Sequence, residues 1–121
     1  MTQERRYARR HLCSFPVTLS GNEPESQTGI ACDLSALGIG VRLHRSVVTA
    51  LAQGGNIMTA GDLVTITLPV VAGTEFGGRP LAARVRHVRR LSQDEYLGGL
   101  LFNDADALDD SAVVALVKAG G

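Results

Sequence analysis

Short stretches of alternating apolar and polar residues, each followed by a turn signal, constrain the fold of this 121-residue chain most. Between residues 14 and 20, Phe15, Val17 and Leu19 alternate with polar residues or proline, which is the two-residue period of a β-strand. Comparable strand patterns cover residues 30–34, 39–44, 63–68, 81–91 and 96–102, and fourteen glycines supply turns. Six short strands in series predict a mainly β fold, an antiparallel sheet closed into a six-stranded barrel.

The stretch 81–91 carries an irregularity in its alternation. Arg84 and Arg86 fall opposite the apolar positions, but Val88 then falls on the same parity as the arginines. An extra residue in the strand restores the apolar face after such a slip. The sequence therefore predicts a β-bulge near Arg86-His87.

The faces of the second and third strands follow from the same period. Ile30, Cys32 and Leu34 are expected on one face, with Asp33 on the other. The next strand follows after a turn and is a plausible hairpin partner. Residues 46–60 remain ambiguous: their first half is compatible with a helical turn that Gly54-Gly55 would end.

The C-terminal segment switches to helical spacing. Acidic residues precede it, and Lys118 and Gly120 lie at its end, which suits the helix dipole and a glycine stop. The sequence therefore predicts a C-terminal α-helix packed at one end or side of the barrel. Its apolar positions are Leu108, Ala112, Val113, Leu116 and Val117.

Charge is distributed unevenly along a chain whose formal net charge is zero. Residues 1–12 carry four arginines and one glutamate and show no periodicity, so they are expected to form a flexible arm. Residues 13–121 are expected to form the single barrel domain with its helix. A basic arm alone is also typical of nucleic-acid binding, but the neutral net charge and the scarcity of stacking aromatics argue against that class.

Nothing in the sequence indicates secretion or a membrane span. The N-terminus is charged and has no apolar signal segment, and no stretch reaches the roughly 20 apolar residues of a membrane helix. Cys13 and Cys32 are therefore expected to be reduced thiols in a cytoplasmic protein. Two cysteines and three dispersed histidines are too few for a typical metal site, and no nucleophile–base pair is visible, so we expect neither a metal nor an enzyme.

Two motifs carry the functional signal. The first is an R-x-x-x-R pair, Arg6 and Arg10, whose forked guanidinium groups suit phosphates and the N7/O6 edge of guanine. The second is D-x-S-x-x-G, formed by Asp33, Ser35 and Gly38. The carboxylate can accept from a guanine edge, the hydroxyl can donate to a phosphate or hold the turn, and the glycine admits a positive φ and close approach of a ligand.

In this order, with a strand between them, the two motifs resemble the signature of the PilZ domain family, a bacterial receptor module for cyclic di-GMP. The resemblance extends over nearly the whole chain, through residues 39–43 to Gly98-Gly99-Leu100-Leu101-Phe102. A second pair, Arg5 and Arg9, leaves the arginine register open, although Glu4-Arg5-Arg6 favours Arg6/Arg10. The resemblance implies a cyclic di-GMP site at Arg5, Arg6, Arg10, Asp33, Ser35 and Gly38, with Arg9, Gly40, Arg42 and Arg86 as additional candidates.

The resemblance also implies a mechanism and an alternative. Cyclic di-GMP, with no other cofactor, would order the arm on the barrel and signal to an unknown downstream protein in trans, in the control of motility, exopolysaccharide synthesis or virulence. The alternative is a ligand-independent adaptor of the same fold that binds proteins instead. Whether the chain is a monomer or a homodimer, and whether one or two ligands bind, stays open.

Overall fold

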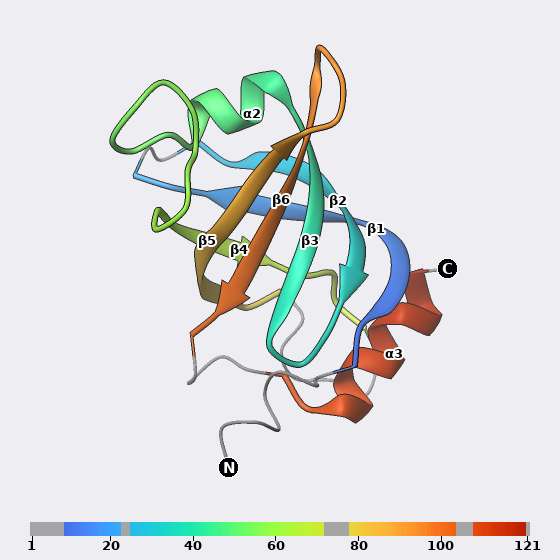
Figure 1. Ribbon diagram of the computed structural model, residues 1–121. Helices are drawn as coiled ribbons and strands as arrows, with labels where there is room; N and C mark the ends of the chain where they lie inside the picture. The colour runs from blue at the N-terminus through green and yellow to red at the C-terminus, as the bar shows by residue number, and fades with distance from the viewer. Residues whose placement is uncertain (1–8, 23–24, 72–77, 104–107, 121) are drawn as a thin grey trace.

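Six antiparallel strands form a closed barrel in the computed structural model of the chain, which describes residues 9–22, 25–71, 78–103 and 108–120 (Figure 1). Around the barrel the strand order is β1-β2-β3-β6-β5-β4. This architecture confirms the predicted six-stranded antiparallel barrel. The strands are β1 (His11–Ser20), β2 (Gln27–Leu34), β3 (Gly38–His44), β4 (Leu63–Thr67), β5 (Pro80–Arg90) and β6 (Glu95–Phe102).

The barrel interior is filled by aliphatic side chains from alternate strand positions. Leu19, Ile66 and Leu81 are fully buried, and so is Met58 from the segment before β4. Branched and unbranched aliphatic side chains fill a small barrel without polar atoms that would need partners. The alternation that predicted the strands thus also decides which face of each strand points inward.

The predicted bulge in β5 is confirmed. Val85 pairs with Leu100 and His87 pairs with Gly99, so Arg86 is one extra residue on β5. Arg86 and His87 are both exposed. The slip lets the strand keep Val85 inside while two successive side chains face outward.

The predicted faces of β2 are wrong for Ile30. Ile30 is 42% exposed, whereas Ala31 is fully buried. A second bulge explains the difference. Ala31 pairs with Val41, and Asp33 pairs with the adjacent β3 residue, Gly40, so Cys32 is an extra residue on β2. The bulge changes the phase between Ala31 and Asp33, and Leu34 returns to the interior.

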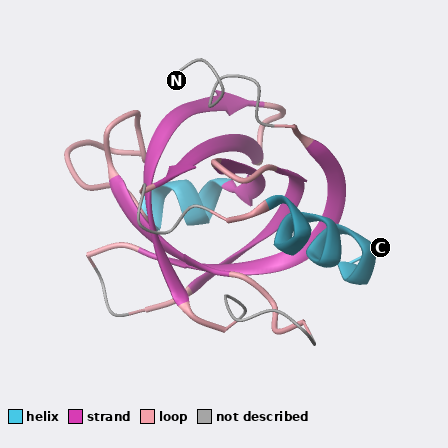
Figure 2. Ribbon diagram, turned by 90° about the horizontal axis from the view of Figure 1, so that it is seen from below, coloured by secondary structure: helices cyan, strands magenta, loops and turns pink. Residues whose placement is uncertain are grey.

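A short helix, α2 (Arg45–Ala50), follows β3 directly and was only ambiguously indicated by the sequence. The imidazole of His44 accepts a hydrogen bond from the Ser46 N–H at 3.1 Å and caps the helix start. Val47 and Val48 are buried, and the helix ends before Gly54-Gly55. In Figure 2 the strands form a ring with α2 inside its outline, so α2 covers one end of the barrel.

The predicted C-terminal helix is present as α3 (Asp110–Gly120) and packs against β1. Asp109 caps it, because its Oδ1 accepts from the Ala112 N–H at 2.8 Å. That hydrogen bond, together with one from the Ser111 hydroxyl, lowers the pKa of Asp109. Val113 and Leu116 are buried, as the helical spacing predicts, while residues 104–107 lie outside the described residues.

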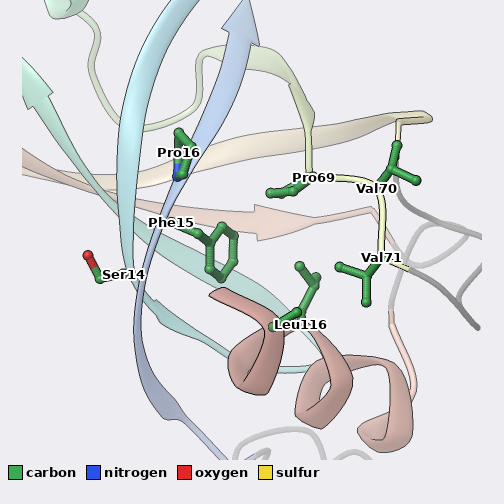
Figure 3. A pocket seen from close by; sticks show the side chains of 8 residues that line it. Ser14, Phe15, Pro16, Pro69, Val70, Val71 and Leu116 are labelled. Carbon is green, nitrogen blue, oxygen red and sulfur yellow. The ribbon is translucent and has the colours of Figure 1, made fainter. Parts of the chain in front are cut away.

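The barrel closes through a short seam between β1 and β4. Only residues 18–20 of β1 pair with β4, opposite residues 65–67. Beyond the seam an apolar pocket of about 330 Å³ lies between β1, residues 69–71 and α3. Figure 3 shows Phe15, Leu116 and Val71 turned toward one another across it. Helix α3 therefore covers the part of β1 that β4 leaves unpaired.

Candidate ligand-binding site

The loop between β2 and β3 is fixed by Ser35. This side chain is only 3% exposed, and its Oγ accepts from the N–H groups of Leu37 and Gly38, each at 3.2 Å. The Ser35 N–H donates to the Gly38 carbonyl at 2.9 Å. Of the two roles expected for this hydroxyl, the structure supports holding the turn, and this fixes the strand end that carries Asp33.

Gly38 does not have the predicted positive φ. Among the residues that the structure describes, only Gly61 and Gly78 have positive φ values. A Cβ added at Gly38 would instead collide with the Leu100 carbonyl oxygen of β6. Gly38 is required because the β3 and β6 backbones approach closely there, which is a packing role.

One residue from each sequence motif meets its counterpart in space. Arg10, just before β1, donates from Nη1 to Asp33 Oδ1 on β2 at 2.5 Å. The side chain of Arg10 is 56% exposed and that of Asp33 is 24% exposed, so the pair is open to solvent. The two residues are separated by 23 positions in sequence, and the motif pair assigned both to one ligand site without predicting this direct bond.

A single cross-strand row extends from Asp33 over four strands. Asp33 pairs with Gly40, Gly40 pairs with Gly99, and Gly99 pairs with His87. A Cβ at Gly40 would approach Asp33 Oδ2 to 2.5 Å, and a Cβ at Gly99 would collide with the His87 ring. The two outer side chains therefore lean inward over bare glycine backbone.

The row forms the floor of a groove of about 570 Å³. Arg10 and Asp33 line one end, and Arg86, His87 and Arg89 line the other. Leu97 and three glycines complete the lining. Three guanidinium groups and one carboxylate give the groove a positive balance, and this suits an anionic ligand with hydrogen-bonding edges.

The remaining predicted residues do not all line the groove. Arg42 does not line the groove: its Nη2 donates to Glu95 Oε1 at 2.7 Å, which raises the pKa of Arg42. Arg9 is exposed at the start of the described residues, and Arg5 and Arg6 lie outside them. Gly40 and Arg86 both line the groove.

The predicted residue set omitted part of the groove wall. His87, Arg89 and Gly99 line the groove but were not among the predicted residues. The phase slip in 81–91 was the available signal, because a bulge turns neighbouring side chains to the same face. The glycine pair 98–99 was noted for its family resemblance, but its pairing with β3 and β5 depends on strand register.

Both cysteines lie beside this site, where the pairing register between β1 and β2 shifts. They are free thiols, each partly buried. Burial, followed by the nearby Asp33 carboxylate, raises the pKa of Cys13 to about 11. The same two causes raise the pKa of Cys32, whose Sγ donates to the Gly40 carbonyl at 3.4 Å. At neutral pH both are protonated and poorly nucleophilic.

In the described part of the chain, no group of three or more histidine, cysteine or acidic residues is arranged to hold a metal ion. Neither α2 nor α3 has the length and apolar character that a membrane-spanning helix requires.

Comparison with known proteins gives the chain its family. The solved structure of the Bacillus subtilis inhibitor of motility (MotI/DgrA) superposes with a TM-score of 0.56 at 18% sequence identity. The match covers 96% of this chain and 49% of that one, so the chain spans about half the length of that protein. No curated protein gave a significant sequence match. The family model for the PilZ domain matches residues 3–119, and the chain therefore belongs to the PilZ domain family.

Proposed function

We propose that this chain is a cyclic di-GMP receptor that acts in the bacterial cytoplasm and signals to a partner protein. The observation that carries the proposal is the meeting of Arg10 and Asp33 at one end of a groove whose other end holds Arg86 and Arg89. Both halves of the PilZ signature thus contribute to one surface, and PilZ domains act as binding modules rather than as enzymes.

The chemistry of the groove fits the proposed ligand. Cyclic di-GMP has two phosphates, which charge-assisted bonds from arginine stabilise, and two guanines, whose N7 and O6 accept bidentately from a guanidinium. Asp33 accepts from the N1–H and N2 amine of one guanine. The ligand has only to share or replace the Arg10–Asp33 bond, and an exposed ion pair of this kind contributes roughly 0–1 kcal/mol.

The arm supplies the switch in this proposal. Arg10 lies immediately before β1, so the arginines that precede it, Arg5 and Arg6, can reach the same ligand. Binding then holds the arginine-rich arm against the groove and changes the surface that a partner meets. MotI/DgrA is named as an inhibitor of motility, so motility is the first output to examine, ahead of exopolysaccharide synthesis and virulence.

Calorimetric titration of cyclic di-GMP into the purified protein tests the proposal, with GTP and cyclic GMP as control ligands. We expect selective binding that Arg10→Ala weakens by at least ~10-fold, since a charge-assisted hydrogen bond contributes about 1.5–3 kcal/mol. Asp33→Ala is expected to act similarly. Arg84→Ala is the matched control, because Arg84 is an exposed arginine of β5 that does not line the groove.

Two results would contradict the proposal in different ways. Wild-type affinity in Arg10→Ala would remove this residue from the site. Absence of heat with folded wild-type protein at high ligand concentration would favour the alternative, a ligand-independent adaptor. Pull-down of a protein partner with and without cyclic di-GMP then separates a switched receptor from a constitutive adaptor.

A further inference from the structure

Strand β5 is strongly basic along its exposed side. Residues 79–92 contain five arginines and no acidic residue, and all five arginines are exposed. In the part of the chain that the structure describes, the arginines that pair with a carboxylate are Arg10, Arg42 and Arg45, none of which belongs to β5. The positive charge of this strand is therefore available to an anionic partner from outside the chain.

Two exposed leucines lie on either side of Arg84. Leu63 of β4 and Leu101 of β6 both pair directly with Arg84, so the three residues form one leucine–arginine row on the outer face of the barrel. Leu63 is 55% exposed and Leu101 is 42% exposed. None of the three residues lines the ligand groove or the apolar pocket. The row is thus a separate surface that combines free positive charge with exposed apolar area.

The opposite side of the barrel provides a comparison. Strand β2 is three positions from β5 around the ring and carries Ile30, which is also 42% exposed. The β3 partner of Ile30 is Arg42, whose guanidinium group binds Glu95. An exposed apolar residue beside an arginine therefore occurs on both sides, but the arginine charge is neutralised beside Ile30 and not in the leucine–arginine row.

A partner at this row must be bound by side chains alone. Arg84 and Leu101 lie inside a closed sheet, and the backbone N–H and carbonyl of Leu63 already bond the side chain of Gln53. No strand can therefore be added here by backbone pairing. A protein hot spot usually places an anchor side chain in a pocket, and the row lines neither the groove nor the apolar pocket. A lipid surface needs no pocket, because it adapts to the side chains that enter it.

We propose that the leucine–arginine row is a docking surface for a membrane that contains anionic phospholipids. Arg84 binds lipid phosphate groups, Leu63 and Leu101 enter the boundary between headgroups and acyl chains, and the neighbouring Arg86 adds electrostatic attraction. An arginine close to an anionic membrane contributes enough for its removal to weaken binding roughly fivefold. The inference goes beyond the proposed function and does not require cyclic di-GMP.

Flotation of the full chain with lipid vesicles tests the proposal. We expect binding to vesicles of phosphatidylglycerol and phosphatidylcholine, no binding to phosphatidylcholine alone, and loss of binding at about 1 M salt, where screening reduces the Debye length to about 3 Å. Arg84→Glu should weaken binding by roughly 10-fold or more, because it removes one positive charge and adds a negative one.

Matched variants separate the row from the basic arm, which can also adsorb to an anionic surface. Leu63→Ser combined with Leu101→Ser should weaken vesicle binding several-fold, whereas Ile30→Ser should leave it unchanged, with thermal melts confirming that each variant is folded. Wild-type binding in both Arg84→Glu and the double leucine variant would assign adsorption to the arm and overturn the proposal.

A fluorescent variant gives a direct readout of insertion. Since the wild-type chain lacks tryptophan, Leu101→Trp and Ile30→Trp each introduce a single fluorophore, at positions of equal exposure on opposite sides of the barrel. We expect anionic vesicles to shift the emission of Leu101→Trp to shorter wavelength, and lipids with brominated acyl chains to quench it. Ile30→Trp should remain unchanged, and an equal response of the two variants would overturn the proposal.

Failure of this proposal can be distinguished from failure of the proposed function, because the vesicle assay contains no cyclic di-GMP. If the wild-type chain binds no anionic vesicles, the lipid surface is overturned, and an acidic protein surface becomes the alternative occupant of the row. If the chain binds vesicles through Arg84 but gives no heat with cyclic di-GMP, the docking surface stands and the receptor function falls.

Discussion

The groove and the apolar pocket described above differ in the residues that form them. The groove between Arg10 and His87 has a floor of bare glycine backbone and walls of charged side chains. The pocket beside α3 is lined almost entirely by apolar side chains, among them Phe15, Pro69 and Leu116. One is formed across paired strands of the sheet, and the other fills the place where pairing between β1 and β4 stops.

From this contrast we expect the groove to serve ligand recognition and the apolar pocket to serve barrel closure. In the groove, missing side chains create the space, and the charges that line it are exposed and accessible to a ligand. In the apolar pocket, two prolines lack the N–H that a further strand would need, and helix packing takes the place of a sheet partner. Changes in the groove should therefore alter binding at nearly constant stability, and changes around the pocket should do the reverse.

The largest expected effect is on stability, at Phe15. Its side chain is 4% exposed and faces α3 from β1 in the apolar pocket. Phe15→Ala should lower the free energy of unfolding by about 3–5 kcal/mol, measured by urea denaturation. Cyclic di-GMP affinity at low temperature, where the variant stays folded, should be unchanged.

Val70 provides the control for that change. It lines the same pocket but is 79% exposed, so Val70→Ala should alter stability by less than about 0.5 kcal/mol. A loss of less than 1 kcal/mol in Phe15→Ala would show that the pocket does not contribute to barrel closure as described.

Effects of intermediate size are expected for Gly38 and Gly40, two glycines that the sequence assigned to the same ligand site. Their substitution should change different properties. Gly38→Ala forces a methyl group against the Leu100 carbonyl and should cost about 1–3 kcal/mol of stability. Gly40→Ala meets only the end of the Asp33 side chain, which can swing away. It should therefore weaken ligand binding several-fold and change stability by less than about 0.5 kcal/mol. Thermal melts with calorimetry decide, and the opposite pattern would refute the division.

The smallest effect concerns the thiol beside the groove. Because the pKa of Cys13 is raised from 9.0 to about 11, alkylation should be slow at pH 8 and should accelerate toward pH 11 as thiolate forms. The folded state binds this proton more tightly than the unfolded chain, so the associated stability is complete below pH 9 and is lost as the pH rises toward 11.

Asp33→Asn supplies the test of the cause. Removing the carboxylate should lower the pKa of Cys13 and speed alkylation in a Cys32→Ser background, as followed by mass spectrometry of the peptide that contains Cys13. An unchanged rate would assign the shift to burial alone.

Features that depend on the local alternation of apolar and polar residues could be predicted from the sequence. Features that depend on the register between strands could not. The strand series, the C-terminal helix and the bulge near Arg86 follow from alternation and its interruption, and all three are present. The predicted inward face of β2 was wrong at Ile30, because the bulge at Cys32 cannot be recognised from the residue types in this strand. A one-residue shift of this kind reverses every face beyond it.

The candidate site shows the same division. Asp33 and Arg10 belong to motifs that assigned both residues to one site, whereas their direct ion pair was not predicted. The row that joins Asp33 to His87 through Gly40 and Gly99 depends on three strand pairings between residues far apart in sequence. The packing role of Gly38 was not predicted, because a close approach of two backbones cannot be recognised from a motif that also describes a turn.

The short seam between β1 and β4 has a kinetic consequence. With three residue pairs, it is the least extensive of the six strand pairings, so it is the place where the barrel should open first during native-state fluctuations. Hydrogen exchange should therefore be faster for amides at residues 65–67 on β4 than for those at residues 97–100 on β6. Because β1 also follows directly from Arg10, a ligand that fixes this arginine would slow that opening from outside the seam.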